Sequence, residues 1–304
     1  MSTLKYHLKL GILILKKVTL SGVFEAMRLR FLSAEGFNKI PMNLINDHIN
    51  NKMCLEIGGP SRVFMGDNIL PIYKMAIMID NVDYSQETIW IVSDERTKER
   101  IFSKTITNEA SDLNKIDNDT YNIVISSNVI EHLSNPLLAL LEMKRVIREN
   151  GLIIVIVPHK DITFDHKRKI TKMVSLIQNF KVHTKEGDIS HLNLERIFEE
   201  YDLDLDPPAG DLDSFKRRTF DNISHRALHQ VVFNTQLLLE MFNWAGIKIL
   251  YVRTSLSIGH ILAIGEKIHS QSDKDHNFNS NFLSSEADWR YETIFRSEKL
   301  KKKV

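Results

Sequence analysis

A double-glycine turn at Gly58 and Gly59 is the stretch of the sequence whose residue types best suit ligand binding. It follows a short apolar run that contains Glu56, and it precedes Pro60 and Ser61. Glycine adopts positive φ readily and places no Cβ between the backbone and a ligand, so such a turn can approach a nucleotide-like molecule closely. The turn does not match the dinucleotide pattern G-x-G-x-x-G, because Pro60 stands at the second glycine. A pyrophosphate cradle is therefore disfavoured.

Acidic side chains follow the next two pieces of the chain. Asp83 comes after a mostly apolar run, about 25 residues beyond the first glycine, where a doubly wound fold presents an acid to a ribose. Asp80 competes with Asp83 for this role. Glu109 stands at a predicted strand end, where its carboxylate could reach an adenine amino group. These positions favour a site for an adenosine-like ligand.

Base-type side chains follow the fifth apolar run, which stops at Pro158. His159, Asp165 and His166 come directly after it. The carboxyl end of a strand in an open parallel sheet faces the ligand crevice, so these side chains start near any bound molecule. Imidazole suits a general base because its pKa lies near neutrality, and a nearby carboxylate can orient the ring. We take these three residues as the candidate catalytic set. A purely structural role is the alternative for each histidine, and for His132 we favour packing or a place in the cleft wall.

Metal-ligand residue types are present without a compact metal signature. They are His166, His191, His225 and His229, with Asp165 and Glu195. His225 and His229 lie four residues apart, but no third ligand is close in sequence. We therefore assign no metal ligands, and metal-assisted chemistry stays open.

The elements that must position these residues alternate between strand and helix. The predicted strands are 54–57, 76–82, a third piece at 108–113, 121–126, 152–157, 247–252 and 261–265, and the predicted helices are 137–147 and 234–244. Asn135 and Pro136 open the first helix, and its apolar residues form one stripe. Short apolar runs that end in Gly, Asp or Asn occur in any α/β protein, but their order here favours a doubly wound, mostly parallel sheet.

Five segments in this order resemble class I S-adenosylmethionine-dependent methyltransferases, of the type 11-like kind. They are Leu-Glu-Ile-Gly-Gly-Pro, Val-Asp-Tyr-Ser, Glu-Ala-Ser-Asp-Leu, Tyr-Asn-Ile-Val-Ile-Ser-Ser-Asn-Val-Ile-Glu-His-Leu and Arg-Glu-Asn-Gly-Leu-Ile-Ile-Val-Ile-Val-Pro. The resemblance covers residues 50–160 and 230–267, and the combination is more specific than any one piece. It implies a seven-stranded Rossmann-like sheet with an antiparallel last strand, and S-adenosyl-L-methionine as cofactor.

The resemblance also implies a role for individual residues. It places Glu56, Gly58 and Gly59 near the methionine moiety, Asp83 at the ribose, Glu109 and Ala110 beside the adenine, and Ser127 and Asn128 on the cofactor floor. Pro60 and Arg62 depart from the family pattern, which has glycines at these positions.

Four segments divide the chain. Residues 1–48 form an N-terminal helical segment, 49–158 with 230–267 form the cofactor-binding core, 159–229 form a helical insert after the fifth strand, and 268–304 form a polar C-terminal tail. A connection of about 70 residues is far longer than a compact α/β fold needs, so we predict a substrate lid or small subdomain. Its opening, Pro-His-Lys followed by Thr-Phe-Asp-His, resembles methyltransferases associated with bacterial surface-glycan assembly.

Composition limits the remaining choices. The net charge of the 304-residue chain is +1, so we predict no attraction to nucleic acid. The single cysteine, Cys54, fits a core position and a reducing, cytoplasmic compartment. The run 10–15 is too short to span a membrane. The basic, amphipathic first thirty residues either pack over the cofactor cleft, which we favour, or rest on anionic lipid at the inner face of the membrane.

Two hypotheses follow for function. The first is methyl transfer from S-adenosylmethionine to a hydroxyl or amino group of a small-molecule or glycan-type acceptor, with metal assistance left open. The second is a non-catalytic module of the same fold that acts as a partner in a glycan-assembly complex. A nucleotide-sugar-modifying enzyme is disfavoured, because the first turn lacks phosphate-binding glycines.

Overall fold

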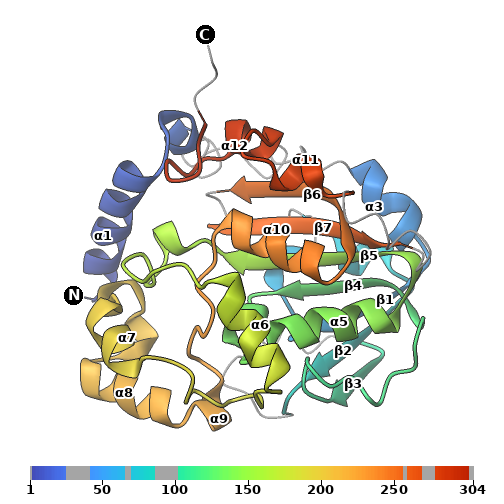
Figure 1. Ribbon diagram of the computed structural model, residues 1–304, viewed down its shortest axis with the longest axis horizontal. Helices are drawn as coiled ribbons and strands as arrows, with labels where there is room; N and C mark the ends of the chain where they lie inside the picture. The colour runs from blue at the N-terminus through green and yellow to red at the C-terminus, as the bar shows by residue number, and fades with distance from the viewer. Residues whose placement is uncertain are drawn as a thin grey trace.

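A single seven-stranded sheet forms the centre of the computed structural model, which describes residues 2–24, 42–65, 70–85, 102–255, 259–268 and 278–300. The strands are β1 (Met53–Ile57), β2 (Met78–Asp83), β3 (Lys104–Thr107), β4 (Tyr121–Ser127), β5 (Ile147–Pro158), β6 (Ile247–Ser255) and β7 (His260–Lys267). Their order is β3-β2-β1-β4-β5-β7-β6 (Figure 1). Strands β1 to β5 run parallel, and β7 runs antiparallel to both β5 and β6. The predicted doubly wound sheet with an antiparallel end is confirmed.

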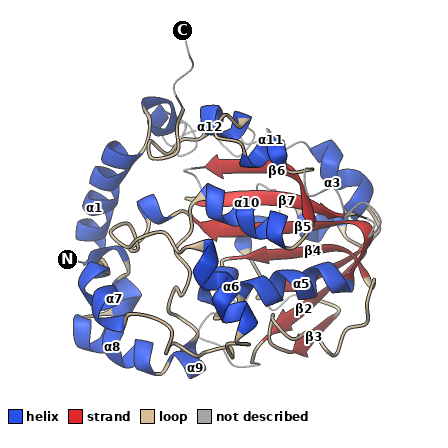
Figure 2. Ribbon diagram, viewed as in Figure 1, coloured by secondary structure: helices blue, strands red, loops and turns tan. Residues whose placement is uncertain are grey.

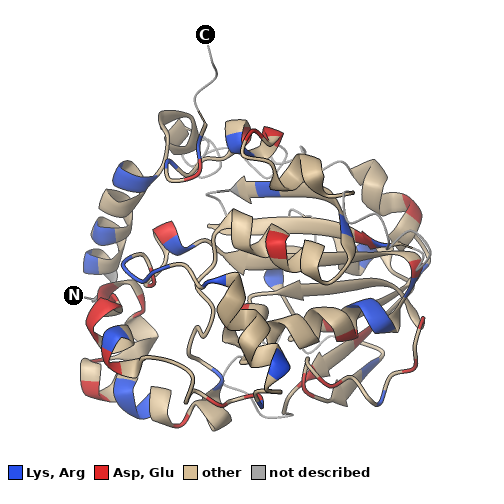
Figure 3. Ribbon diagram, in the orientation of Figure 1, with Lys and Arg blue, Asp and Glu red and all other residues tan. Residues whose placement is uncertain are grey.

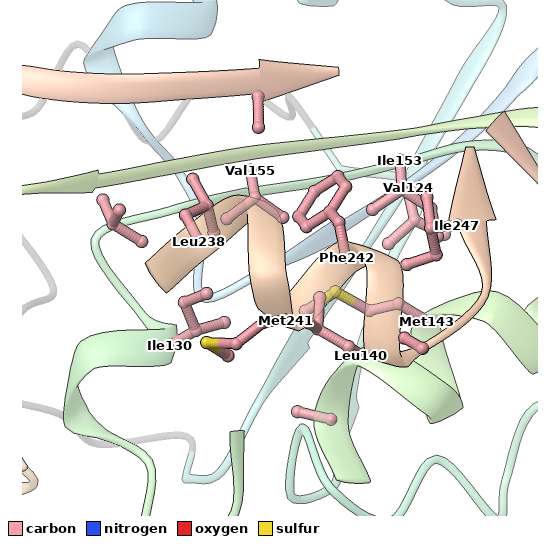
Figure 4. Close-up of a cluster of buried hydrophobic side chains, with 14 of the residues drawn as sticks. Val124, Ile130, Leu140, Met143, Ile153, Val155, Leu238, Met241, Phe242 and Ile247 are labelled. Carbon is pink, nitrogen blue, oxygen red and sulfur yellow. The ribbon is translucent and has the colours of Figure 1, made fainter. Parts of the chain in front are cut away.

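Helices cover both faces of the sheet (Figure 2). One face carries α5 (Pro136–Val146), α6 (Met173–Lys181) and α10 (Thr235–Trp244), and the other carries α3 (Met42–Ile49) and α4 (Ile72–Met75). Successive strand residues point to opposite faces, so β4 and β5 supply apolar side chains to both cores. Figure 4 shows the first core, where Leu238 and Phe242 of α10 lie against Val155 and Ile153 of β5.

Local capping residues set the N-terminal starts of the two predicted helices. The Asn135 side chain accepts a hydrogen bond from the backbone N–H of Leu138, and Pro136 occupies the first turn of α5. The Asn234 side chain accepts from the backbone N–H of Leu237 at the start of α10. Each cap satisfies one backbone donor that the helix itself leaves unpaired.

The insert after β5 builds a small core of its own. Beyond α6, it contains α7 (Leu194–Glu200), α8 (Leu212–Phe220) and α9 (Asn222–His225). The buried members of its core are Ile197, Tyr201, Ala209, Phe215 and Leu228. Helix α6 is different, because Leu176 packs into the core of the main sheet. The segment is therefore anchored to the sheet as well as folded on itself.

The N-terminal helix α1 (Ser2–Lys17) lies along the insert, at the left of Figure 1. Its Lys9 ammonium lies 2.6 Å from an Asp202 carboxylate oxygen and 2.9 Å from one of Asp204, and the Lys5 ammonium lies 2.7 Å from Asp204. Figure 3 shows basic residues along α1 and acidic residues in the neighbouring part of the insert. No helix among the described residues is long and apolar enough to cross a bilayer.

Residues 278–300 pack against the body of the protein, so the prediction of a peripheral tail is wrong for this part of 268–304. They form α11 (Ser280–Leu283) and α12 (Asp288–Glu292), and Trp289 and Phe295 are buried. The backbone pairs with the end of α1 and the residues that follow it: the N–H of Thr19 donates to the carbonyl of Ile294. Residues 269–277 and 301–304 of the predicted tail lie outside the described residues.

Candidate active site

A cavity of about 380 Å³ lies at the carboxyl ends of β1, β2 and β4. We call it the first cavity. Seven of the eight predicted cofactor residues line it: Gly58, Gly59, Asp83, Glu109, Ala110, Ser127 and Asn128. Parallel strands bring their carboxyl ends to one edge of the sheet, which explains why residues far apart in sequence meet here. Their individual contacts with a cofactor stay predictions.

The first turn needs glycine at both positions, for different reasons. Gly58 has φ of +75°, and a Cβ added to it would lie 2.4 Å from Cγ2 of Val129. Gly59 does not have positive φ, but a Cβ there would lie 2.4 Å from the Glu56 carboxylate. Its N–H donates to the Asn81 side-chain oxygen at 2.9 Å. A side chain at either glycine would therefore collide with protein atoms.

Glu56 is not among the residues that line the first cavity, and its predicted contact with a ligand amino group stays a prediction. Its side chain is fully buried and accepts hydrogen bonds from the backbone N–H of Ser61 and from the Tyr73 hydroxyl. Burial raises the pKa of the Glu56 carboxyl to about 7. Glu56 therefore positions the turn, and no sequence pattern indicated that Tyr73 would contact it.

The competition between the two aspartates is resolved by their orientation. Asp80 is buried and accepts a hydrogen bond of 2.6 Å from the Tyr121 hydroxyl, away from the first cavity. Asp83 lines the cavity at the end of β2, and partial burial raises the pKa of its carboxyl. Asp83 is the acid that can accept from ribose hydroxyls.

Glu109 has a partner that the sequence did not reveal. The Arg226 guanidinium donates to both carboxylate oxygens of Glu109, at 2.7 and 3.3 Å, and it lies 5.1 Å from the centre of the Tyr84 ring. Arg226 belongs to the insert and adopts the left-handed conformation just after α9. This bidentate pair closes one side of the first cavity with a residue of the insert.

A second cavity of about 1160 Å³ adjoins the first. Its walls come mainly from the insert, and Tyr6 of α1 contributes to them. The favoured prediction that the N-terminal segment packs over the cofactor cleft stays a prediction, because Tyr6 lines the second cavity and not the first. Three residues line both cavities, namely Asn128, His132 and His260. Molecules in the two cavities would therefore meet at these side chains.

His159 and His166 are not among the residues that line the two cavities, so the site geometry gives no support to either as the catalytic base, and that role stays a prediction. His159 is fully buried, and its ring stacks on Phe295 with centroids 3.5 Å apart and an interplanar angle of 7°. His166 Nε2 lies 2.8 Å from an Asp202 carboxylate oxygen on the α1 side. Spacing alone could not fix these orientations, because irregular backbone follows β5.

Asp165 has an orienting role toward a histidine that the catalytic prediction missed. His229 Nδ1 lies 2.6 Å from one Asp165 carboxylate oxygen, and Arg168 Nη1 donates to the other at 2.7 Å. Burial opposes ionisation of Asp165, but Arg168 and His229 hold the pKa of its carboxyl at about 2. His229 lines the second cavity, so Asp165 fixes the ring of a cavity-wall histidine.

Glu131, His132 and His229 form what we call the junction cluster. Each offers a ligand atom, and these atoms all lie within 4.8 Å of one another. Glu131 and His132 belong to the 3-10 turn η4 (Ile130–His132) just after β4. Burial raises the pKa of the Glu131 carboxyl to about 7 and lowers the pKa of His132 well below its ordinary value. The adjacent Glu-His pair was the available sequence signal, but nothing in the sequence linked it to His229.

A comparison with protein families finds a match over part of the chain. Residues 66–155 match the family model described as a methyltransferase domain. This part of the chain is a methyltransferase domain. Its cofactor is S-adenosyl-L-methionine, and the fold and the predicted resemblance agree with this assignment.

Several solved methyltransferases are similar to this methyltransferase. A SAM-dependent methyltransferase from Aquifex aeolicus is 12% identical, with a TM-score of 0.42 over 81% of this chain and 100% of that chain. One from Methanosarcina mazei is 12% identical, with a TM-score of 0.43 over 74% and 97%. The Burkholderia thailandensis 1,6-didemethyltoxoflavin-N1-methyltransferase is 9% identical, with a TM-score of 0.43 over 81% and 85%. No curated protein sequence matches the chain.

The first cavity fits the cofactor of this methyltransferase. Gly58 and Gly59 line the first cavity with backbone atoms alone, because glycine has no side chain. Asp83 contributes a carboxylate to the wall of the same cavity. Ile57, Val82 and Ile156 give apolar wall. When bound, the sulfonium of the cofactor supplies both the methyl group and the leaving group.

Proposed function

We propose that this methyltransferase transfers the methyl group to a hydroxyl or amino group of an acceptor held in the second cavity. The observation that carries the proposal is that the two cavities adjoin and share Asn128, His132 and His260. Methyl transfer needs the acceptor atom in line with the methyl carbon, so donor and acceptor must meet at one point. The shared wall is the point where that alignment is possible.

The junction cluster supports a hydroxyl as the reacting group. A hydroxyl must lose its proton as it is methylated, whereas an amine that is already deprotonated needs less help. His132 and His229 stand at the second cavity, and Asp165 orients the His229 ring. Asp165 therefore acts through His229, and the chemistry of proton removal belongs to the junction cluster.

The lining of the second cavity supports a polar, glycan-type acceptor. Arg217, Arg218 and Asp221 offer charged hydrogen-bonding groups, and Tyr6 and Phe164 offer aromatic surface. Sugars present hydroxyls at their edges and C–H groups on their faces, which suits this mixture. The resemblance of the start of the insert to methyltransferases of bacterial surface-glycan assembly points the same way.

A place at the inner face of the cytoplasmic membrane suits a lipid-borne acceptor. Leu4, Leu8 and Leu15 of α1 are 78%, 65% and 61% exposed. They lie at helical spacing on one side of α1, while Lys5 and Lys9 are paired with the insert. We therefore include contact of α1 with anionic lipid in the proposal.

Calorimetry with S-adenosylmethionine tests the cofactor part of the proposal. The wild-type protein should bind it, and Asp83→Ala should weaken binding by about 10- to 100-fold, because a charged hydrogen-bond acceptor is lost. Asp117→Ala, which removes an exposed acid outside both cavities, is the matched control. Absence of binding to the folded wild-type protein would rule out the proposed enzyme.

Transfer to an acceptor is tested separately. The protein is incubated with cofactor labelled in its methyl group and with a fractionated lipid and polysaccharide extract. Label in a glycan-bearing fraction is the expected result. Cofactor binding without transfer to any fraction would favour the non-catalytic module of a glycan-assembly complex.

A further inference from the structure

We propose that Glu131, His132 and His229 bind a divalent transition-metal ion, of the Zn²⁺ or Mn²⁺ class, at the junction of the two cavities. The role of the metal rests on the proposed methyl transfer, but its binding does not. This proposal replaces the expectation of no metal ligands with a site whose members come from η4 and from the end of the insert.

In each of the two imidazoles, Nδ1 lies beside a hydrogen-bond acceptor. His132 Nδ1 lies 3.3 Å from the carbonyl oxygen of Leu228, which can only accept, so Nδ1 carries the proton. His229 Nδ1 lies 2.6 Å from the Asp165 carboxylate, which Arg168 keeps ionised. Nε2, the other nitrogen of each ring, is then the atom that would bind a metal ion. A carboxylate or carbonyl behind a histidine is the usual support for a metal-binding imidazole.

Glu131 supplies the second, independent observation. Its side chain is 1% exposed, and neither carboxylate oxygen has a hydrogen-bond partner among the described residues. A buried carboxylate without a partner carries a large desolvation cost. One oxygen lies 3.9 Å from His132 Nε2, which is too long for a direct hydrogen bond and is a distance that a shared cation could bridge. A metal ion would satisfy the carboxylate and both imidazoles at once.

The mixture of ligands indicates the class of ion. Two imidazoles and one carboxylate suit Zn²⁺, Mn²⁺ and related ions, whereas Mg²⁺ and Ca²⁺ prefer oxygen ligands alone. All three ligands line the second cavity, so further coordination positions would face the acceptor. An acceptor hydroxyl bound there would pass its proton to solvent water more easily, because the cation would stabilise the alkoxide. In the metal-bound protein, His132 and His229 would then act as ligands and not as bases.

His225 and His229, which lie four residues apart in the sequence, do not form a metal site by themselves. Helix α9 ends at His225, and Arg226 turns the backbone into the left-handed region with φ of +47°. The two histidines therefore do not lie on consecutive turns of one helix. His225 is a matched control, because it lines the same cavity outside the junction cluster.

Metal binding is tested on the full chain by metal analysis and by titration. The protein is purified without chelator, its metal content is measured, and it is then stripped and titrated with Zn²⁺, Mn²⁺, Co²⁺ and Mg²⁺. One equivalent of a transition ion should bind, and Co²⁺ should give visible absorption bands. Glu131→Gln and His229→Asn should abolish this binding, and Asp165→Asn should weaken it about 10- to 100-fold through loss of support for His229. His225→Asn should leave the affinity unchanged.

Circular dichroism and S-adenosylmethionine calorimetry on the same samples separate the possible failures. If the stripped wild-type protein is folded and binds the cofactor but takes up no transition ion, or only Mg²⁺, the metal proposal is overturned and the proposed function stands. The same conclusion follows if folded Glu131→Gln and His229→Asn retain wild-type metal affinity. If metal binds but the cofactor does not, the proposed function fails and the metal site stands.

Discussion

Glu56 is a buried carboxyl group whose hydrogen bonds hold the Gly58–Gly59 turn in place. It accepts from Ser61 and Tyr73, and its own burial raises its pKa from 4.5 to about 7. Below the ordinary pKa, the carboxyl is protonated in both folded and unfolded chains. Between the two pKa values the folded chain alone holds the proton, so the free energy of unfolding falls as the pH rises.

We expect this pH dependence to disappear in Glu56→Gln. From about pH 5 to about pH 8 the wild type should lose up to about 3 kcal/mol of stability relative to the variant. Urea unfolding of both proteins at the two pH values measures the difference. Parallel pH profiles would contradict the raised pKa of Glu56.

The sequence predicted residues at strand ends better than residues whose neighbours come from distant segments. Apolar patterning located the ends of β2 and β4. Asp83 and Asn128 stand at these ends, and both line the first cavity. The Asp165–His229 contact joins residues 64 positions apart, and no periodicity encodes it. The stacking of the His159 ring on Phe295, a residue of the segment predicted to be a tail, was likewise not visible in the sequence.

Helix α10 depends on a residue from far along the chain. The Glu298 carboxylate accepts from the backbone N–H of Thr235 at 2.7 Å and from its hydroxyl at 2.6 Å. Glu298 is buried, and Thr235 stands in the first turn of α10. A negative charge at this end of a helix also interacts favourably with the helix dipole. The helix itself was predicted correctly, but its contact with Glu298 could not be predicted from the residues around α10.

We expect Glu298→Ala to lower the free energy of unfolding by about 1–3 kcal/mol, since two buried donors of Thr235 lose their acceptor. Chemical denaturation followed by circular dichroism measures the change. Glu292→Ala, at an exposed position of α12, should alter stability by less than about 0.5 kcal/mol. Equal effects of the two substitutions would argue against the capping role.

At the scale of the whole molecule, α1 presents an apolar strip to its surroundings. The insert neutralises Lys5 and Lys9 on one side of the helix, which leaves Leu8 and Leu15 directed elsewhere and exposed. The amphipathic pattern of α1 is visible in the sequence, but the orientation of the helix is not, because its acidic partners Asp202 and Asp204 lie in the insert.

We expect the protein to float with vesicles that contain anionic lipid, and Leu8→Asp with Leu15→Asp to weaken this binding by at least about tenfold. Vesicle flotation at fixed protein concentration measures the bound fraction. Val174→Asp changes an equally exposed apolar residue on α6 and should have no effect. Equal flotation of the double variant and the wild type would exclude α1 as the lipid contact.

The pairing of Thr19 with Ile294 has a consequence for the order of events during synthesis. The backbone N–H of Arg296 also donates to the carbonyl of Lys17. Two backbone hydrogen bonds therefore join segments that the ribosome makes at widely separated times. Until residues 294–298 emerge, the His159 ring lacks its stacking partner and α10 lacks the Glu298 cap. A nascent chain can therefore form most of the parallel sheet early, but it must wait for the last packed segment before the region behind the second cavity is complete.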